Sequence, residues 1–143
     1  MPFRTAEAVS PAHPDKVADQ ISAAILTETL VRHPGARVAV EVLIGHGTCA
    51  IVGEITADVK GNPVSISDVA AAVLTELGYD PNAFKYTIDI HEQSRQIAQG
   101  VDTGGAGDQG IMVGYACRDI IEMIAEELYL ARKILKAIVA KHG

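Results

Sequence analysis

Hydrophobic residues recur at helical spacing after His13 and predict a long first helix. Pro14 suits the first helical position, where its missing N–H is no loss, and His33-Pro34-Gly35 ends the helix. One apolar stripe comprises Val17, Ile21, Ala24 and Ile25, and a second side carries Leu26 and Leu30. A helix that is apolar on two sides is expected to be buried on both, in a core or against another subunit.

Alternating hydrophobic residues between Arg37 and Thr56 predict a β-hairpin that turns at Gly45-His46-Gly47. Each strand carries one carboxylate among apolar neighbours, Glu41 in the first and Glu54 in the second. A one-residue change of register moves every side chain of a strand to the other face. A loop centred on His46 is expected to place the two carboxylates on opposite faces of the sheet.

The rest of the pattern predicts two more helices, three more strands and a long loop. The helices cover Asp68 to Leu77 and Ile120 to Lys141, the strands cover Phe3 to Ser10, Tyr86 to His91 and Ile111 to Tyr115, and the loop covers residues 92–107. The order β-α-β-β-α-β-β-α predicts an α+β fold with three helices on one face of a mostly antiparallel sheet. A chain of 143 residues is long enough for a single domain, residues 1–143, with its own core.

Composition narrows the class of protein. Apolar residues make up 48% of the chain and charged residues 21%, which favours a folded domain. The net charge is −6 and no basic face exists outside the last helix, which argues against nucleic-acid binding. No apolar run approaches the ~20 residues of a membrane span, and the N-terminus lacks the hydrophobic region of a signal peptide. Since Cys49 and Cys117 are also isolated, we expect a cytoplasmic protein with two free thiols.

The residues that begin the first helix are candidates for chemistry. His13-Pro14-Asp15-Lys16 puts an imidazole, a carboxylate and an ammonium within one turn. A helix N-terminus binds anions, and Asp15 could hold a divalent cation that bridges phosphates. The same side chains also suit structural roles, as a cap, a first-turn acid and a helix lysine. Glu41 and Glu54 are costly in apolar strands unless a cation pairs with them or the strand is exposed.

A glycine-rich stretch, Gly105-x-Gly107-x-x-Gly110, formally matches the dinucleotide-binding fingerprint. That fingerprint follows a strand closely and opens a helix, whereas a predicted strand comes after it here. Rossmann-type binding is therefore disfavoured. What remains is a backbone that can approach a ligand closely, with Asp108 and Gln109 near its end.

Several motifs, in order along nearly the whole chain, resemble the S-adenosylmethionine synthetase (methionine adenosyltransferase) family. They are Thr5 to Ser10, His13 to Ile21, Gly53 to Thr56, Gln93-Ser94 with Ile97 to Val101, Gly105 to Gly110, and Gly114 to Ala116. The His-Pro-Asp-Lys and Gly-Ala-Gly-Asp-Gln-Gly sequences form a highly specific pair. The resemblance implies synthesis of S-adenosylmethionine from ATP and L-methionine. In that reaction the methionine sulfur attacks the ribose C5′ and displaces triphosphate, which is then hydrolysed.

The resemblance also implies roles for individual residues. The catalytic group is His13, Asp15 and Lys16, in which His13 hydrogen-bonds the leaving triphosphate and Asp15 ligates Mg²⁺. The methionine-binding residues are Glu54, Gln93 and Asp108; the nucleotide-binding residues are Glu7, His13, Asp108 and Gln109; and Glu41 matches the family's K⁺ site. Residues 92–107 correspond to a mobile lid, in which the family's Ser-Pro-Asp is replaced by Ser94-Arg95-Gln96.

The resemblance covers only the N-terminal part of a family member, and the later parts carry further metal-binding acids and the bases that bind triphosphate. Three hypotheses stay open: a part of a larger or split synthetase, a truncated homologue that self-associates and binds methionine or nucleotide without turnover, and a self-sufficient minimal enzyme. Family sites form between two subunits, which implies a homo-oligomer, either a dimer or a tetramer. We expect self-association through the hairpin sheet, or a complex with the missing C-terminal part.

Overall fold

The computed structural model describes residues 3–56, 63–93, 104–105 and 109–142. The chain divides into two compact units, which are treated separately below. The sheet unit is Pro11–Gly107, and the terminal unit is Met1–Ser10 together with Asp108–Gly143. The single domain expected over residues 1–143 stays a prediction.

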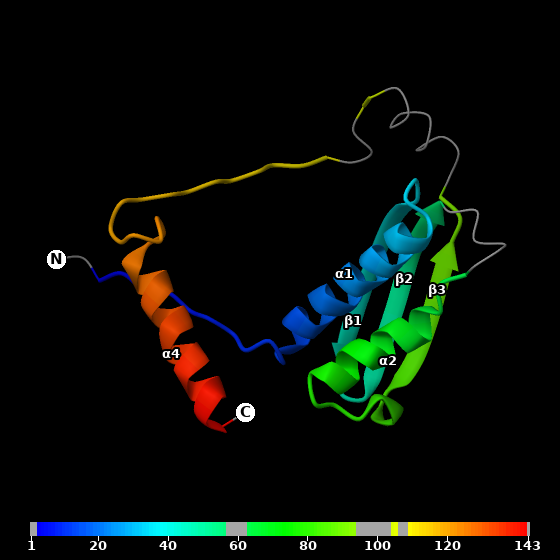
Figure 1. The fold of residues 1–143 in the computed structure, drawn as a ribbon, viewed down its shortest axis with the longest axis horizontal. Helices are drawn as coiled ribbons and strands as arrows, with labels where there is room; N and C mark the ends of the chain where they lie inside the picture. The colour runs from blue at the N-terminus through cyan, green and yellow to red at the C-terminus, as the bar shows by residue number, and fades with distance from the viewer. Residues whose placement is uncertain (1–2, 57–62, 94–103, 106–108, 143) are drawn as a thin grey trace. The chain divides into compact units, whose positions relative to one another are not determined.

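The sheet unit contains two helices and a three-stranded sheet. Its elements are α1 (Pro14–Arg32), β1 (Arg37–Gly45), β2 (Thr48–Thr56), α2 (Ile66–Glu76), the short 3₁₀ helix η1 (Pro81–Ala83) and β3 (Lys85–His91). The sheet order is β1-β2-β3 (Figure 1). The predicted first helix, the hairpin, the helix from Asp68 to Leu77 and the strand from Tyr86 to His91 are therefore confirmed, with small differences at their ends.

The sheet is mixed, whereas a mostly antiparallel sheet was expected. β1 and β2 are antiparallel, as a hairpin requires, but β2 and β3 are parallel. The reason is α2, which lies between β2 and β3 in the sequence. It returns the chain to the end of the sheet at which β2 begins, so that β3 runs in the same direction as β2. Parallel neighbours need such a crossover connection, and a helix usually supplies it.

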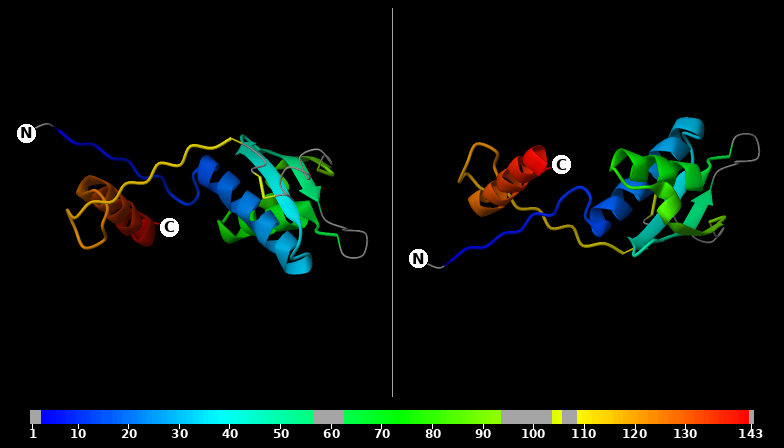
Figure 2. Two further views of the ribbon diagram at one scale, coloured as in Figure 1. Left: turned by 90° about the horizontal axis from the view of Figure 1, so that it is seen from above. Right: turned by 90° about the horizontal axis from the view of Figure 1, so that it is seen from below.

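Both helices of the sheet unit cover one face of the sheet (Figure 2). The core lies between these helices and the sheet. The buried residues come from all the main elements: Val17, Ile21 and Ile25 of α1, Val40 and Ile44 of β1, Cys49 and Ile51 of β2, and Ala70 and Leu74 of α2. The second apolar side of α1, with Leu26 and Leu30, is partly exposed in the chain itself. Of the two apolar sides of α1 that were predicted to be buried, only the side with Val17, Ile21 and Ile25 is buried within the sheet unit.

The terminal unit contains one helix, α4 (Glu126–His142), so three helices on a single face are not established. The predicted helix began at Ile120, six residues before the observed start. Met123 explains the difference, because its φ of 60° lies in the left-handed region and cannot continue a helix. The N-terminal segment contributes Arg4, which pairs with Asp119 at 3.3 Å and Glu127 at 3.6 Å.

Two predicted strands of the terminal unit are absent from its described residues. Phe3 to Ser10 and Ile111 to Tyr115 are extended but have no strand partner. The side chains of Ile111 and Val113 are 93% and 90% exposed. Alternation predicts which residues would share a face, but a strand also needs a neighbour to accept its backbone hydrogen bonds.

Candidate functional site

His13 caps the first helix with both its backbone and its side chain. Its carbonyl accepts from the Val17 N–H at 2.9 Å, and its Nδ1 accepts from the Asp15 N–H at 3.3 Å. In a neutral imidazole one nitrogen accepts and the other carries the proton. With Nδ1 accepting this bond, a neutral His13 carries its proton on Nε2, which is then the nitrogen that can donate to a ligand.

The other two charged side chains of this turn are accessible. The Asp15 carboxylate is 88% exposed, at a helix end that favours negative charge. Lys16 Nζ lies 3.1 Å from the Asp19 carboxylate. Exposed pairs of this kind contribute little, about 0–1 kcal/mol, so Lys16 can exchange Asp19 for another anion at small cost.

The register of the hairpin places Glu41 and Glu54 on the same face of the sheet, which corrects the prediction of opposite faces. Glu41 lies opposite Val52, and Glu54 lies opposite Ala39. Residues directly opposite each other share a face, as do residues two apart in one strand. The prediction was wrong because it assumed a loop centred on His46. The turn has two residues, His46 and Gly47, both with positive φ (47° and 73°), which suits a tight hairpin.

This shared face is the one that the helices leave uncovered, and we call it the open face. It comprises the alternate positions Ala39, Glu41, Leu43, Ala50, Val52, Glu54, Thr87, Asp89 and His91. Leu43 is 76% exposed and Val52 46% exposed on it. The carboxylates therefore avoid the cost of burial in the core, which was one of the alternatives left open by the sequence.

Gly53 fits the backbone next to Glu54 in a way that no other residue can. Its φ is +148°, and an added Cβ would lie 2.1 Å from the Ala39 carbonyl oxygen. A glycine inside a strand pattern often marks such a close approach of two backbones. Gly53 thus brings β1 and β2 together at the position that orients Glu54.

The open face also carries Asp89 and His91, which the sequence patterns did not single out as candidates. Asp89 lies beside Val52 and His91 beside Glu54 in the parallel pair. His91 Nε2 is 2.8 Å from Asp89 Oδ1. The alternation of β3 was a sufficient signal to put both residues on one face, but the positions of Asp89 beside Val52 and of His91 beside Glu54 depend on the parallel pairing, which was not expected.

The start of α1 and the two glutamates lie apart within one chain. Pro14 and Val17 line a pocket of about 190 Å³ with the hairpin residues Ile44, Gly45, His46 and Gly47, so the helix start lies at the turn end of the sheet. Glu54 is six residues along β2 from Thr48, about 20 Å at the usual rise per residue. The helix start is also on the covered side of the sheet, and the glutamates are on the open face.

A comparison with known proteins gives a consistent family. The model of the S-adenosylmethionine synthetase N-terminal domain matches residues 2–101. The S-adenosylmethionine synthase of Fusobacterium nucleatum is 45% identical over 138 residues, which are 93% of this chain and 35% of the relative. That of Salinibacter ruber is 38% identical over 144 residues, which are 94% of this chain and 36% of the relative.

The chain belongs to the S-adenosylmethionine synthetase family. A solved structure agrees: an unusual S-adenosylmethionine synthetase from Campylobacter jejuni has a TM-score of 0.78 and 29% identity, over 92% of this chain and 35% of that one. The chain spans little more than a third of the length of the curated relatives it matches. The predicted family is therefore confirmed, as is the match to its N-terminal part.

The other residues implied by the synthetase resemblance are less well defined. Gln93 lies two residues after the end of β3, and its Oε1 is buried without a hydrogen-bond partner among the described residues. Glu7 and Gln109 are exposed in the terminal unit. Asp108 and most of the predicted lid, residues 94–103 and 106–107, lie outside the described residues.

The described part of the chain contains neither a clustered metal site nor a membrane-spanning helix. There, no three His, Cys, Asp or Glu residues are grouped closely enough to hold a metal ion. Asp15 is a single accessible carboxylate, which fits Mg²⁺ because that ion commonly takes one or two carboxylates together with water and substrate phosphates. None of the described helices has the length and apolar character of a membrane span.

Proposed function

We propose that this chain forms part of an enzyme that makes S-adenosylmethionine from ATP and L-methionine, with displacement and hydrolysis of triphosphate. Family membership supports the reaction. The chain's share of its relatives' length supports a larger or split enzyme. The observation that carries the proposal is that Glu41 and Glu54 share the open face of the sheet, in a chain that also exposes the His13 side chain in part and the Asp15 carboxylate.

The start of α1 would form the triphosphate side of the site. His13 would donate its Nε2 hydrogen to the leaving oxygen, since Nδ1 is occupied as the helix cap. Lys16 would leave its exposed pair with Asp19 for a phosphate oxygen. Asp15 would hold Mg²⁺, and this ion would neutralise the negative charge that develops on the leaving triphosphate. The resemblance adds Glu7, Asp108 and Gln109 as nucleotide-binding residues.

The open face would form the methionine side. The Glu54 carboxylate would pair with the methionine ammonium, with Gln93 and Asp108 as further ligands, and Glu41 would contribute to a K⁺ site. These groups bind and orient the substrate. Nothing has to activate the thioether, because the sulfur is itself the nucleophile, so alignment with the ribose carbon is the main requirement.

The two sides would meet between two copies of the chain. Within one copy they lie on opposite sides of the sheet, with Glu54 about 20 Å from the turn end. Exposed Leu43 and Val52 give the open face an apolar centre suited to a second copy. We therefore propose that the chain forms a homo-oligomer. The proposed location is the cytoplasm.

Complementation tests this proposal. The chain is assayed for S-adenosylmethionine formation alone and with the remaining two-thirds of the Fusobacterium nucleatum relative, expressed separately. The expected result is activity in the mixture, lost with Glu54→Gln and retained with Glu76→Gln, which changes an exposed glutamate of α2. Turnover by the chain alone would refute the need for a second part. Methionine or nucleotide binding without turnover in either sample would favour a non-catalytic homologue.

A further inference from the structure

The backbone leading into His13 is held by side chains from two other places in the sheet unit. Three consecutive carbonyls, those of Pro11, Ala12 and His13, each accept a hydrogen bond. The bond to His13 belongs to the helix itself. The bonds to Pro11 and Ala12 come from side chains, so they are additional to what helix formation requires.

Tyr79 supplies the first of these bonds. Its Oη donates to the Ala12 carbonyl at 2.7 Å, across 67 residues of sequence. Its ring meets Phe84 edge-on, with centroids 6.1 Å apart. Both rings also line the 190 Å³ pocket, together with Pro14. The hydrogen bond therefore connects Ala12 to a residue that is distant in the sequence.

Gln20 supplies the second bond from within α1. Its Nε2 donates to the Pro11 carbonyl and to the Lys16 carbonyl, each at 2.9 Å. It thereby connects the chain before the helix to the helix's own second turn. Tyr79 fixes the same segment to the end of α2, so the approach to His13 is held from two directions.

We infer that Tyr79 and Gln20 are positioning residues that hold the His13 imidazole in its capping orientation, with the Nε2 hydrogen facing outward. They act through the backbone and do not reach the proposed substrates. The catalytic role of the Nε2 hydrogen rests on the proposed function. The orientation of the imidazole does not, and it can be measured without any substrate.

The test uses the ¹⁵N-labelled 143-residue chain and the imidazole nitrogen shifts of His13, recorded at about pH 8. The wild-type chain is expected to show the Nε2-protonated tautomer. In Tyr79→Phe, which keeps the ring and removes the donor, we expect the Nδ1-protonated fraction to rise about three- to tenfold, the effect of losing one hydrogen bond. Gln20→Met is expected to act in the same direction.

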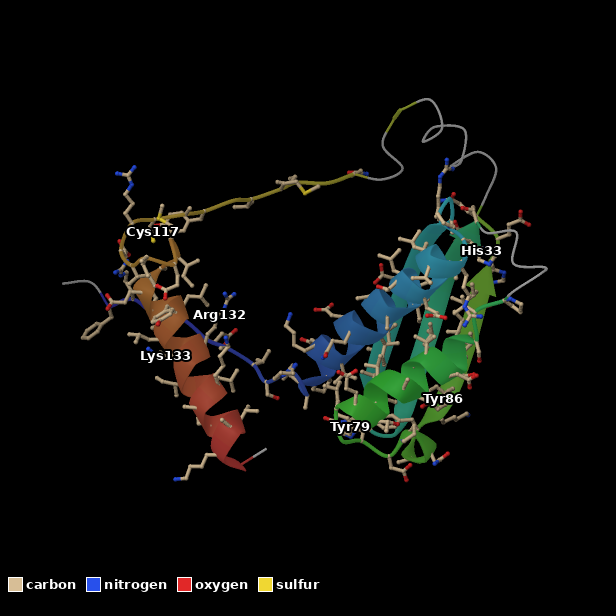
Figure 3. The ribbon with its side chains drawn as sticks, viewed as in Figure 1. His33, Tyr79, Tyr86, Cys117, Arg132 and Lys133 are labelled. Carbon is tan, nitrogen blue, oxygen red and sulfur yellow. The ribbon has the colours of Figure 1, made fainter. Side chains whose placement is uncertain are left out.

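Tyr86→Phe is the matched control (Figure 3). It removes a tyrosine hydroxyl that donates to the Pro81 carbonyl at 3.1 Å and not to the segment before His13. It should leave the His13 nitrogens unchanged. Wild-type shifts in Tyr79→Phe, or an equal change in Tyr86→Phe, would overturn the inference. If Tyr79→Phe does not fold, the comparison of Gln20→Met with Tyr86→Phe decides it.

The complemented enzyme separates this inference from the proposed function. A positioning role predicts that Tyr79→Phe lowers kcat about three- to tenfold and leaves the KM for methionine unchanged, since the methionine side is on the open face. If kcat is unaltered while the His13 shifts change, the hydrogen bonds from Tyr79 and Gln20 do not serve to orient a catalytic donor, and this part of the inference is refuted. If the complemented enzyme is inactive even with wild-type sequence, the proposed function fails, and the nitrogen shifts still decide whether Tyr79 positions His13.

Discussion

Gly53→Ala is the substitution with the clearest structural consequence. The φ of Gly53 is +148°, a region that residues with a Cβ avoid, and the new methyl carbon would lie 2.1 Å from the Ala39 oxygen and 2.9 Å from the Val40 Cα. Neither neighbour is the flexible end of a side chain, because both belong to the backbone of β1. The hairpin must therefore open locally, next to the pair formed by Ala39 and Glu54.

The magnitude follows from two terms. A residue forced into a sparsely populated backbone region costs about 1–3 kcal/mol. Opening the ladder removes one or two hydrogen bonds at about 0.5–1.5 kcal/mol each. Together these reduce the free energy of unfolding by about 2–6 kcal/mol, against a typical total of about 5–15 kcal/mol.

Urea unfolding followed by circular dichroism measures the loss. With a slope of about 1–3 kcal/mol/M, the midpoint should fall by about 1 M or more, if the variant folds at all. Gly35→Ala is the matched control, since its φ is not in the left-handed region and its added Cβ meets nothing within 4 Å. Removing that glycine should be neutral or stabilise by about 0.4–1 kcal/mol. Equal midpoints for the two variants would refute the close approach at Gly53.

Three further predictions concern the site, the core and a buried thiol. Glu54→Gln removes the charge proposed to pair with the methionine ammonium, so calorimetry of the complemented enzyme should show binding weakened about 10- to 100-fold, with Glu76→Gln unchanged. Ile21→Ala empties a fully buried position and should lower the free energy of unfolding by about 2–5 kcal/mol, measured in urea, with a smaller loss for the partly exposed Leu30→Ala. Burial raises the pKa of the Cys49 thiol above 9.0. The folded state therefore holds this proton after the unfolded state has released it, so stability should decline as pH rises above about 9, and Cys49→Ala should flatten that decline.

Local patterns were sufficient to predict most of the sheet unit. Pro14 at the first helical position and the break at His33 set the ends of α1 within a residue. The hairpin and β3 followed from alternation. These features depend on neighbours within a few residues, where dihedral preference and periodicity act directly.

The features that were missed depend on partners far away in the chain or on a single residue of register. The parallel pairing of β2 with β3 depends on α2 crossing between them. The shared face of Glu41 and Glu54 depends on a turn of two residues instead of three. Ile111 to Tyr115 has the residue types of a strand, yet no described neighbour pairs with it. Periodicity specifies which side chains share a face, and long-range contacts decide what that face meets.

A mixing experiment tests whether the site is shared between copies of the chain. His13→Ala and Glu54→Gln each remove one side of it, so each variant alone should be inactive when complemented. In a mixed two-fold dimer, one site combines both lesions and the other combines the intact His13 of one copy with the intact Glu54 of the other. Equal amounts give half of the dimers mixed, each with one of two sites intact, so activity should return to about one quarter of wild type.

A site contained in one chain predicts a different result. Each copy would then carry its own lesion in every combination, and mixing would restore nothing. The structure favours the shared site because His13 caps a helix on the covered side of the sheet, whereas Glu54 lies on the open face, about 20 Å from the turn end. Because the strands keep these two groups apart within one chain, the proposed site requires the helix start of a second copy near the open face. Absence of any recovered activity in a mixture shown to contain mixed dimers would refute the shared site.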